Sequence, residues 1–442
     1  MATRLLPLLA LGTVLFGPGE PDVTAPLRLA SRAPSGSPLQ GASGSELDLS
    51  DDGQQLVFTS ESDELVPDDD NTLTDVFVRN ALGSVRRLST GHDGTDSDGP
   101  SRHPALSGDG RWAAFTSFAT NLEAAPQLSI WGDVFLRDMR TGELVCLSRG
   151  PDGQEGDGTS ERPALSDDGT RVVFQSFADN LLPGDDNGFS DIFLWDATSG
   201  ELRLLSHGID GSPARGHSTH PTISGDGRTV SFASDAPNLV ADDTNGRLDL
   251  FVLDVRGPDG DSAPTIERVA LVGAPHAGRA DVAPSFDSRT HAATFPRSAL
   301  SQDGRFVAFP SRATPHDDQQ IVVLDRSTGR RESVSATYRG EPADGRCDAP
   351  TISADGRFVG FLSEARNLHL ADGDPLRDVF LKDRKTGALR LLSTRCWPRG
   401  TRNDALSVAL AGRAGVAAFG SQGSDHVAGD TNGNPDVFLR EL

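Results

Sequence analysis

Oxygen-bearing side chains recur with the same spacing in five loops of the sequence. An Asp is followed two residues later by Asn or Asp, and six residues later by another Asp. The five sets are Asp69, Asn71 and Asp75; Asp185, Asn187 and Asp191; Asp243, Asn245 and Asp249; Asp372, Asp374 and Asp378; and Asp430, Asn432 and Asp436. Calcium-binding loops place oxygen ligands at positions 1, 3 and 7, so calcium is a candidate cofactor.

An ordinary turn explains the same letters in another way. Asp and Asn fold loops by accepting hydrogen bonds from the backbone two residues further on. Turn formation accounts for the first Asp, but not readily for a carboxylate at position 7 of all five loops. On the sequence alone, a metal site and a pure turn both remain open.

The loops belong to a longer repeat. The segment Ser-x-Asp-Gly-x-x-x-x-Phe occurs six times, and a seventh, less regular copy ends at Phe419. The first six copies begin at Ser50, Ser107, Ser166, Ser224, Ser301 and Ser353. Successive phenylalanines are about 60 residues apart, which fits one four-stranded blade of a β-propeller with long loops.

Each unit divides into four predicted strands, named a to d from the channel outwards. In the third unit they are "PALS" from 163, "VVFQS" from 172, "DIFLWD" from 191 and "ELRLLS" from 201. The Asp-Gly pair before strand b predicts a two-residue hairpin, because the glycine supplies a positive φ. Both faces of strands b and c are apolar, as expected for a sheet between two neighbouring sheets.

These units predict an all-β fold, a propeller of seven four-stranded blades. The last unit lacks a strand d, whereas "LRLAS" at residues 27–31 resembles one, so we expect this N-terminal strand to close the last blade. A single propeller then covers 26–442. Its units begin near 45, 104, 163, 221, 298, 350 and 405. Residues 284–296 form an inserted hairpin, or alternatively a partial eighth blade.

The Ser-x-Asp-Gly repeat resembles the repeat of the TolB-like propeller family, in which a Ser-Pro-Asp-Gly turn precedes a strand that ends in an aromatic residue. The resemblance extends from residue 27 to the C-terminus. It implies the fold, and little about function, because such propellers serve as periplasmic scaffolds, interaction platforms and enzyme subdomains. The TolB propeller itself has six blades and an additional α/β domain, so the resemblance does not imply a Tol-system role.

Three basic side chains come just before the strand-a prolines of successive units. They are His103, Arg162 and His220. Because strand a is innermost, we expect them at the mouth of the central channel, where two His and one Arg can hold an anionic ligand or a metal. The alternative is that they are ordinary loop residues, since Ala283 and Ala349 occupy the positions taken as equivalent.

The chain has three cysteines, too few for a disulfide scaffold. Cys347 precedes strand a of the sixth unit and Cys396 follows its strand d, so both lie on the long-loop face of one blade. We predict a Cys347–Cys396 bridge, provided that the Cα atoms lie within about 7 Å. Cys146 lies inside a strand d and is expected to be free.

The first 25 residues resemble a secretory leader, with Arg4 followed by an uncharged apolar run from Leu5 to Phe16. We therefore expect an exported protein, periplasmic, cell-surface or secreted. No segment reaches the ~20 apolar residues that a membrane-spanning helix needs. A net charge of -23 argues against a nucleic-acid partner.

Together these features predict an exported, monomeric propeller without its own catalytic centre. Its long-loop face, which carries the b–c and d–a connections, would bind a protein or a glycan. The competing hypothesis is a propeller enzyme of the lyase or glycosidase type with its site at the central channel. No acid/base pair has a spacing that distinguishes it from the repeat background.

Overall fold

The computed structural model describes residues 27–37, 39–124, 130–244, 247–255, 264–269, 285–287, 292–294, 297–312, 318–369, 376–394, 404–413, 415–423, 426–427, 430 and 432–442. These residues form strands, turns and irregular segments, as the all-β prediction requires. Among them no helix is long and apolar enough to cross a membrane. The predicted leader lies outside the described residues.

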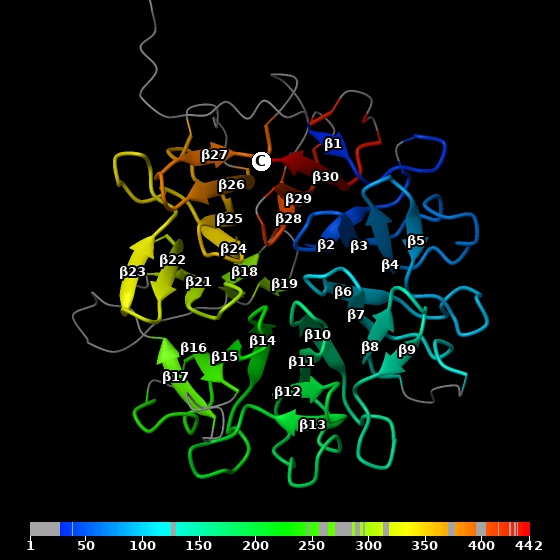
Figure 1. Ribbon diagram of the computed structural model, residues 1–442, viewed down its shortest axis with the longest axis vertical. Coiled ribbons are helices and arrows are strands. Elements are labelled where there is room, and N and C mark those ends of the chain that lie inside the picture. Colours follow the sequence, from blue (N-terminus) through cyan, green and yellow to red (C-terminus); the bar gives the residue numbers. More distant parts are fainter. Residues whose placement is uncertain are drawn as a thin grey trace, which may run out of the picture.

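The described strands form seven four-stranded sheets arranged as blades around a central channel (Figure 1). From strand a to strand d, blades 1 to 4 are β2 (Ser43–Leu49), β3 (Gln55–Ser60), β4 (Asp75–Asn80), β5 (Val85–Arg87); β6 (Ser101–Leu106), β7 (Trp112–Ser117), β8 (Asp133–Asp138), β9 (Leu144–Cys146); β10 (Ser160–Leu165), β11 (Arg171–Ser176), β12 (Asp191–Asp196), β13 (Glu201–Leu204); and β14 (Ser218–Ile223), β15 (Thr229–Ser234), β16 (Asp249–Asp254), β17 (Thr265–Val269). Blades 5 to 7 are β20 (Ala299–Leu300), β21 (Phe306–Ser311), β22 (Gln320–Asp325), β23 (Arg330–Ser333); β24 (Cys347–Ile352), β25 (Phe358–Ser363), β26 (Asp378–Asp383), β27 (Leu389–Leu391); and β28 (Ala405–Leu410), β29 (Val416–Ser421), β30 (Asp436–Glu441), β1 (Arg28–Leu29). The seven-bladed prediction is confirmed.

The N-terminal strand closes the ring, as predicted. β1 pairs antiparallel with β30, with Leu29 opposite Phe438, and in Figure 1 the first strand lies beside the last. The backbone N–H of Ala30 donates to the carbonyl of Val437 at 2.7 Å. Leu29 is buried and belongs to an apolar cluster that blades 6 and 7 share. The closure therefore buries apolar surface and pairs the outer edge of β30.

Apolar side chains of strands b and c fill the space between neighbouring blades. One hydrophobic cluster lies at each of the seven blade interfaces. The repeat phenylalanine of strand b stacks on a phenylalanine of strand c, as Phe58 does on Phe77 at a centroid distance of 5.9 Å. In blade 5, Val322 replaces the second ring. The repeated Phe therefore marks the core of each blade.

The a–b turns differ in detail from the predicted two-residue hairpin. In blade 1 the N–H of Gly53 donates to the carbonyl of Ser50, so Ser50 to Gly53 form a four-residue turn that ends in a glycine of φ 68°. The Ser50 hydroxyl donates to Asp52 and accepts the N–H of Gln55. These side-chain bonds favour a β-turn followed by a left-handed residue.

The a–b turns also connect the blades in a closed ring of backbone hydrogen bonds. At one interface the N–H of Asp51 donates to Gly108, and at the next the N–H of Asp109 donates to Asp167. The remaining bonds of the ring are Asp167 to Gly225, Asp226 to Gln302, Gln302 to Ala354, Ala354 to Gly412, and Arg413 to Asp51. Each interface thus has one main-chain bond at the tight-turn end of the channel.

The predicted inserted hairpin contains β18 (Ser285–Asp287) and β19 (Ala292–Thr294), which form a separate two-stranded sheet. Blade 5 is complete without them. Cys146 and Cys347 are buried, neither forms a disulfide with another described residue, and Cys347 Sγ lies 3.2 Å from Ser363 Oγ. Because Cys396 lies outside the described residues, the Cys347–Cys396 bridge stays a prediction.

Candidate ligand site in the central channel

Strand a of several blades bulges at the residue before its proline. His103, Arg162, His220 and Ala349 have positive φ values of 52°, 58°, 54° and 47°. The pairing with strand b is interrupted at each of these residues. A positive φ is uncommon for residues other than glycine and costs on the order of 1–3 kcal/mol. The surrounding structure must therefore stabilise these bulges.

Side chains from the preceding blade supply that support in three cases. The N–H of His103 donates to Glu46 at 2.5 Å, and the N–H of Arg162 donates to Thr116 Oγ1 at 3.2 Å. The N–H of His220 donates to Gln175 Oε1 at 3.2 Å. Each bulge is thus bonded across a blade interface.

The bulged residues share one position of the repeat, four residues before the serine of the a–b turn. In blades 1 to 6 that position holds Glu46, His103, Arg162, His220, Arg297 and Ala349, and the strand pairing in blade 7 assigns it to Ser407. We call these seven residues the channel ring. The pairing of β20 with β21 assigns Arg297 to blade 5, which corrects the sequence assignment of Ala283.

Members of the channel ring are close enough to change one another's ionisation. Burial lowers the pKa of His103 to about 4; Glu46 opposes this shift, and Arg162 and Arg297 add to it. Burial, followed by Arg162 and Arg297, lowers the pKa of His220 well below its usual value. Both imidazoles are therefore neutral at pH 7, and the ring nitrogens of His103 already contact Glu46 and Thr116.

Glu46 is the carboxylate of the channel ring. Burial by itself would raise its pKa, but His103, Arg297 and Arg162 outweigh that effect, so the pKa is lowered and the group is ionised. Its Oε1 lies 3.2 Å from His103 Nε2. The side chains of Glu46, His103 and Arg162 keep 20%, 14% and 27% of their surface exposed, so a ligand can reach them.

Two guanidinium groups face this single ring carboxylate. Arg162 also lies 3.6 Å from Glu161, its neighbour in the chain. Arg297 is exposed, and none of the described carboxylates lies within ion-pair distance of it. The ring thus offers a positive charge beside two neutral imidazoles, an arrangement that suits a carboxylate, which accepts charge-assisted hydrogen bonds from arginine.

The sequence identified His103, Arg162 and His220, and the structure brings all three together. It missed Glu46 and Arg297. Both stand four residues before a repeat serine, so the repeat register is the signal that locates them. Arg297 was hidden because the segment before it contains a second Pro-Ser sequence, at Pro284, that mimics the start of strand a.

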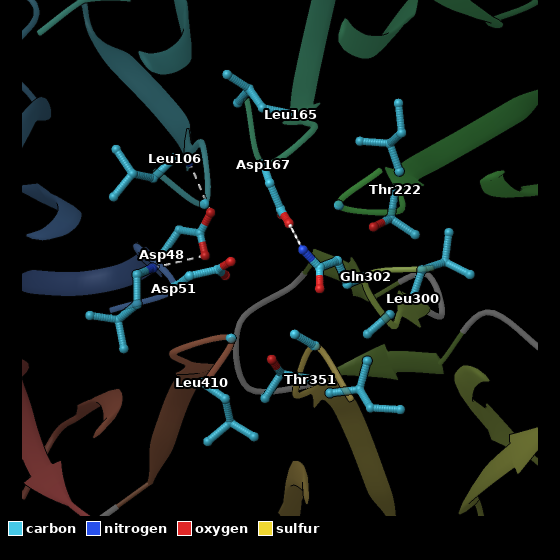
Figure 2. A pocket seen from close by; sticks show the side chains of 18 residues that line it. Asp48, Asp51, Leu106, Leu165, Asp167, Thr222, Leu300, Gln302, Thr351 and Leu410 are labelled. Atoms are coloured by element: carbon cyan, nitrogen blue, oxygen red, sulfur yellow. Dashed lines mark hydrogen bonds between the residues drawn. The ribbon is translucent and has the colours of Figure 1, made fainter. Parts of the chain in front are cut away.

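The opposite, tight-turn end of the channel is acidic (Figure 2). There a cavity of about 160 Å³ is lined by Asp48, Asp51 and Asp167 together with aliphatic residues of strand a. Figure 2 shows Asp167 accepting a hydrogen bond from Gln302 Nε2, at 2.8 Å. Burial, followed by Asp51, raises the pKa of Asp167 to about 6. At this volume the cavity has room for a few waters.

The five acidic loops lie on the long-loop face, and the structure explains their last carboxylate. Asp75 accepts a hydrogen bond from Ser89 at 2.5 Å, and Asp191 accepts one from Ser206 at 2.6 Å. Asp133 does the same with Ser148 in blade 2, which lacks the loop pattern. Position 7 therefore ties the start of strand c to the end of strand d. Nothing in the loop pattern itself points to these serines, which follow strand d.

The asparagines at position 3 form turns. Asn71 Oδ1 accepts the N–H of Leu73 at 2.8 Å, and Asn187 Oδ1 accepts that of Phe189 at 2.7 Å. The amide nitrogen of Asn187 donates to Asp191 Oδ2. Their oxygens thus already accept the bonds that the turn interpretation assigned to them.

The first carboxylate has an arginine partner in blades 1 and 4. Arg87 Nη1 lies 2.9 Å from Asp69 and 3.8 Å from Asp75. Arg268 Nη1 lies 3.1 Å from Asp243 and 3.5 Å from Asp249.

Asn245, Asp372 and Asp374 lie outside the described residues. Within the part that the structure describes, no group of three or more His, Cys, Asp or Glu side chains is arranged to hold a metal. Calcium at the five loops stays a prediction.

No protein-family model matches the chain, and no curated protein matches its sequence. Several solved structures resemble it. The oligogalacturonate lyase of Vibrio parahaemolyticus is 14% identical, with a TM-score of 0.50 over 95% of this chain and 97% of the lyase. An oligogalacturonate lyase in complex with manganese is 16% identical, with a TM-score of 0.52 over 94% of this chain and 96% of that one.

The likeness to TolB is more distant. TolB from Acinetobacter baumannii is 15% identical, with a TM-score of 0.42 over 77% of this chain, and this chain spans 63% of the TolB chain. An acylaminoacyl peptidase matches over 91% of this chain and 52% of its own, with a TM-score of 0.52 and 11% identity. At these identities the comparisons show a shared propeller fold.

Proposed function

We propose that this protein is an exported binding module that holds an acidic group of a glycan or protein partner in its channel ring. The partner approaches from the long-loop face, and Arg297 and Arg162 contact its carboxylate. The observation that carries the proposal is the charge of Arg297, which has no ion-pair partner among the described residues, beside His103 and His220. Export rests on the predicted leader.

The composition of the ring itself suits binding better than glycoside hydrolysis. Two-carboxylate glycoside hydrolysis needs a second acid whose pKa is raised, so that it can donate a proton. Glu46 is the ring's carboxylate, its pKa is lowered, and it is already engaged with the backbone and imidazole of His103. Its negative charge orients a bound acid towards the arginine side of the ring.

Titration calorimetry with oligogalacturonate tests this proposal, because two structures with the same fold are named as lyases of that acidic sugar chain. A neutral oligosaccharide of equal length serves as the ligand control. We expect the acidic chain to bind more tightly, and Arg297→Gln to weaken it about tenfold or more, the loss of roughly one charge-assisted hydrogen bond.

Arg330→Gln is the matched control, because Arg330 is exposed on the outer strand β23, far from the channel. It should leave the affinity unchanged. Equal binding by the parent protein and Arg297→Gln would contradict the proposed site. Cleavage of the sugar chain, seen as new reducing ends or new ultraviolet absorbance, would instead support the propeller-enzyme hypothesis.

A further inference from the structure

Blade 3 differs from blades 1 and 4 at one position of strand d. In the strand pairing, Arg87 lies opposite Phe77 and Arg268 lies opposite Phe251. The equivalent residue opposite Phe193 is Leu204. The place that a guanidinium occupies in blades 1 and 4 therefore has no side-chain cation from strand d in blade 3.

The two carboxylates that flank this place are nevertheless retained. Asp185 is 5% exposed and Asp191 is 1% exposed. Asp191 accepts hydrogen bonds from Ser206 and Asn187, both at 2.6 Å. Asp185 Oδ1 is buried without a hydrogen-bond partner. Buried carboxylate oxygens are almost always paired, because desolvation without a partner is costly.

The charges around Asp185 are all negative. Burial, followed by the carboxylates of Asp191, Asp179 and Asp186, raises its pKa to about 7. In blade 1 the corresponding Asp69 has Arg87 to oppose the same effects. Blade 3 thus concentrates acidic side chains around a buried, unpartnered oxygen and supplies no cation of its own among the groups that affect it.

We propose that blade 3 binds one divalent cation between Asp185 and Asp191, at the place that the guanidinium of Arg87 or Arg268 occupies in blades 1 and 4. Carboxylate oxygens are hard ligands, so calcium is the preferred ion. Asp185 contributes the unpartnered oxygen, Asp191 a shared one, and water completes the coordination shell. Asn187 positions the loop through its turn bonds and does not itself coordinate the ion.

This inference is independent of the channel ring and explains why the acidic loops are not alike. An arginine in strand d neutralises the pair in blades 1 and 4. Where a leucine replaces the arginine, an ion from solution neutralises the pair. Leu391 occupies the same position in blade 6, opposite Phe380, so the rule extends to that blade as a sequence criterion. In blade 7 Leu29 lies at this position, but Arg32 opposes the burial that raises the pKa of Asp436, so that blade has a cation of its own.

Thermal melting of the full chain in millimolar calcium and in chelator tests the proposal, together with the calcium stoichiometry from calorimetry. We expect calcium to raise the melting temperature of the parent protein by a few degrees. Asp185→Asn should reduce the stoichiometry by one ion and shrink the calcium-dependent shift, while melting higher than the parent in chelator because a repulsive charge is gone.

Leu204→Arg supplies the missing guanidinium and should also remove one ion. If this variant fails to fold, Asp185→Asn still decides. Asp69→Asn is the matched control: it makes the same change in blade 1, where Arg87 already lies beside the carboxylates, and should leave the stoichiometry unchanged.

If Asp185 is instead protonated and binds no ion, the expected results differ. The parent would melt higher as the pH falls from 8 to 6 and would not respond to calcium at any pH. That result, or an unchanged stoichiometry in Asp185→Asn, would overturn the cation site.

Discussion

The two ends of the channel are built from the same seven strands and carry opposite character. At the long-loop end, His103, Arg162, His220 and Arg297 give the channel ring a basic side. Asp48 lies two residues beyond the ring position, and Asp51 and Asp167 lie five residues beyond it; together they make the tight-turn end acidic. A strand rises about 3.3 Å per residue, so these carboxylates follow the ring by roughly 7 to 17 Å along the channel.

Backbone geometry explains why the ends differ. At the tight-turn end every blade interface has a main-chain hydrogen bond, and the Ser-x-Asp-Gly turn is nearly invariant from blade to blade. At the long-loop end the bulges release strand a from its regular pairing, and the side chains differ between blades. Repetition maintains the scaffold at one end, whereas variation at the other creates a site.

The largest effect should come from removing the closing strand, on which both ends depend. A chain that starts at Arg32 loses the burial of Leu29, the β1–β30 pairing and the Ser31–Asp436 hydrogen bond. We expect a loss of roughly 4 to 7 kcal/mol against a chain that starts at Glu20. Denaturant unfolding measures it. Equal stability would mean that β1 does not hold the ring together.

A substitution at a turn glycine should lower stability at the tight-turn end without changing ligand binding at the long-loop end. Gly169 has a φ of 67°, and a Cβ there would lie 2.2 Å from Trp112 of the neighbouring blade. Gly169→Ala should cost about 2–4 kcal/mol through backbone strain and overpacking. Gly142→Ala, at φ 82° with open space, isolates the strain. Ligand affinity should survive in both folded variants, and a selective loss in Gly169→Ala would show that the ends are coupled.

The acidic end predicts a pH dependence. The pKa of Asp167 is raised to about 6, so its ionised form costs stability at pH 7, and this cost disappears as the pH falls from about 6 to below the unfolded value near 3.8. Asp167→Asn can still accept the bond from Gln302. It should stabilise the protein at pH 7 by about 1–3 kcal/mol and flatten the melting temperature between pH 7 and 5. A melting temperature that depends more steeply on pH in the variant than in the parent would contradict the predicted direction of this effect.

The smallest expected effect is a change in ligand affinity at the basic, long-loop end of the channel. Glu46→Gln keeps an acceptor for the N–H of His103 but removes the ring's negative charge. Affinity for an acidic ligand should rise about two- to fivefold, since charges this close interact by roughly 1 kcal/mol. Glu201→Gln, on an exposed site of β13, should leave the affinity unchanged. A weaker complex with Glu46→Gln would place the ligand against Glu46 instead.

Local patterns were sufficient to predict the architecture. The Phe repeat marks strand b, and the Ser-x-Asp-Gly turn marks the a–b connection. The strand at residues 27–31 can pair with the last unit, because that unit lacks a strand d. The turn type was wrong in detail, because side-chain bonds of Ser50 and its equivalents convert a two-residue loop into a longer turn.

The candidate sites were predicted less completely, because their residues meet only through long-range pairing. Asp69 and Asp75 belong to one sequence pattern, but Arg87, which neutralises them, comes from strand d. Ser89, whose hydroxyl donates a hydrogen bond to Asp75, follows that strand. In the same way, only the pairing of β20 with β21 shows that Arg297 shares a position with His103.

The pairing of β1 with β30 also has a consequence for biosynthesis. Residues 28–29 are translated before the first six blades, but their partners at 438–439 are translated only after them. Blades 1 to 6 can form as they emerge, whereas the seventh waits for β30. Until then the strand at residues 27–31 has no partner, and an unpaired strand is open to aggregation. A chaperone that shields residues 27–31 would therefore be most useful during elongation.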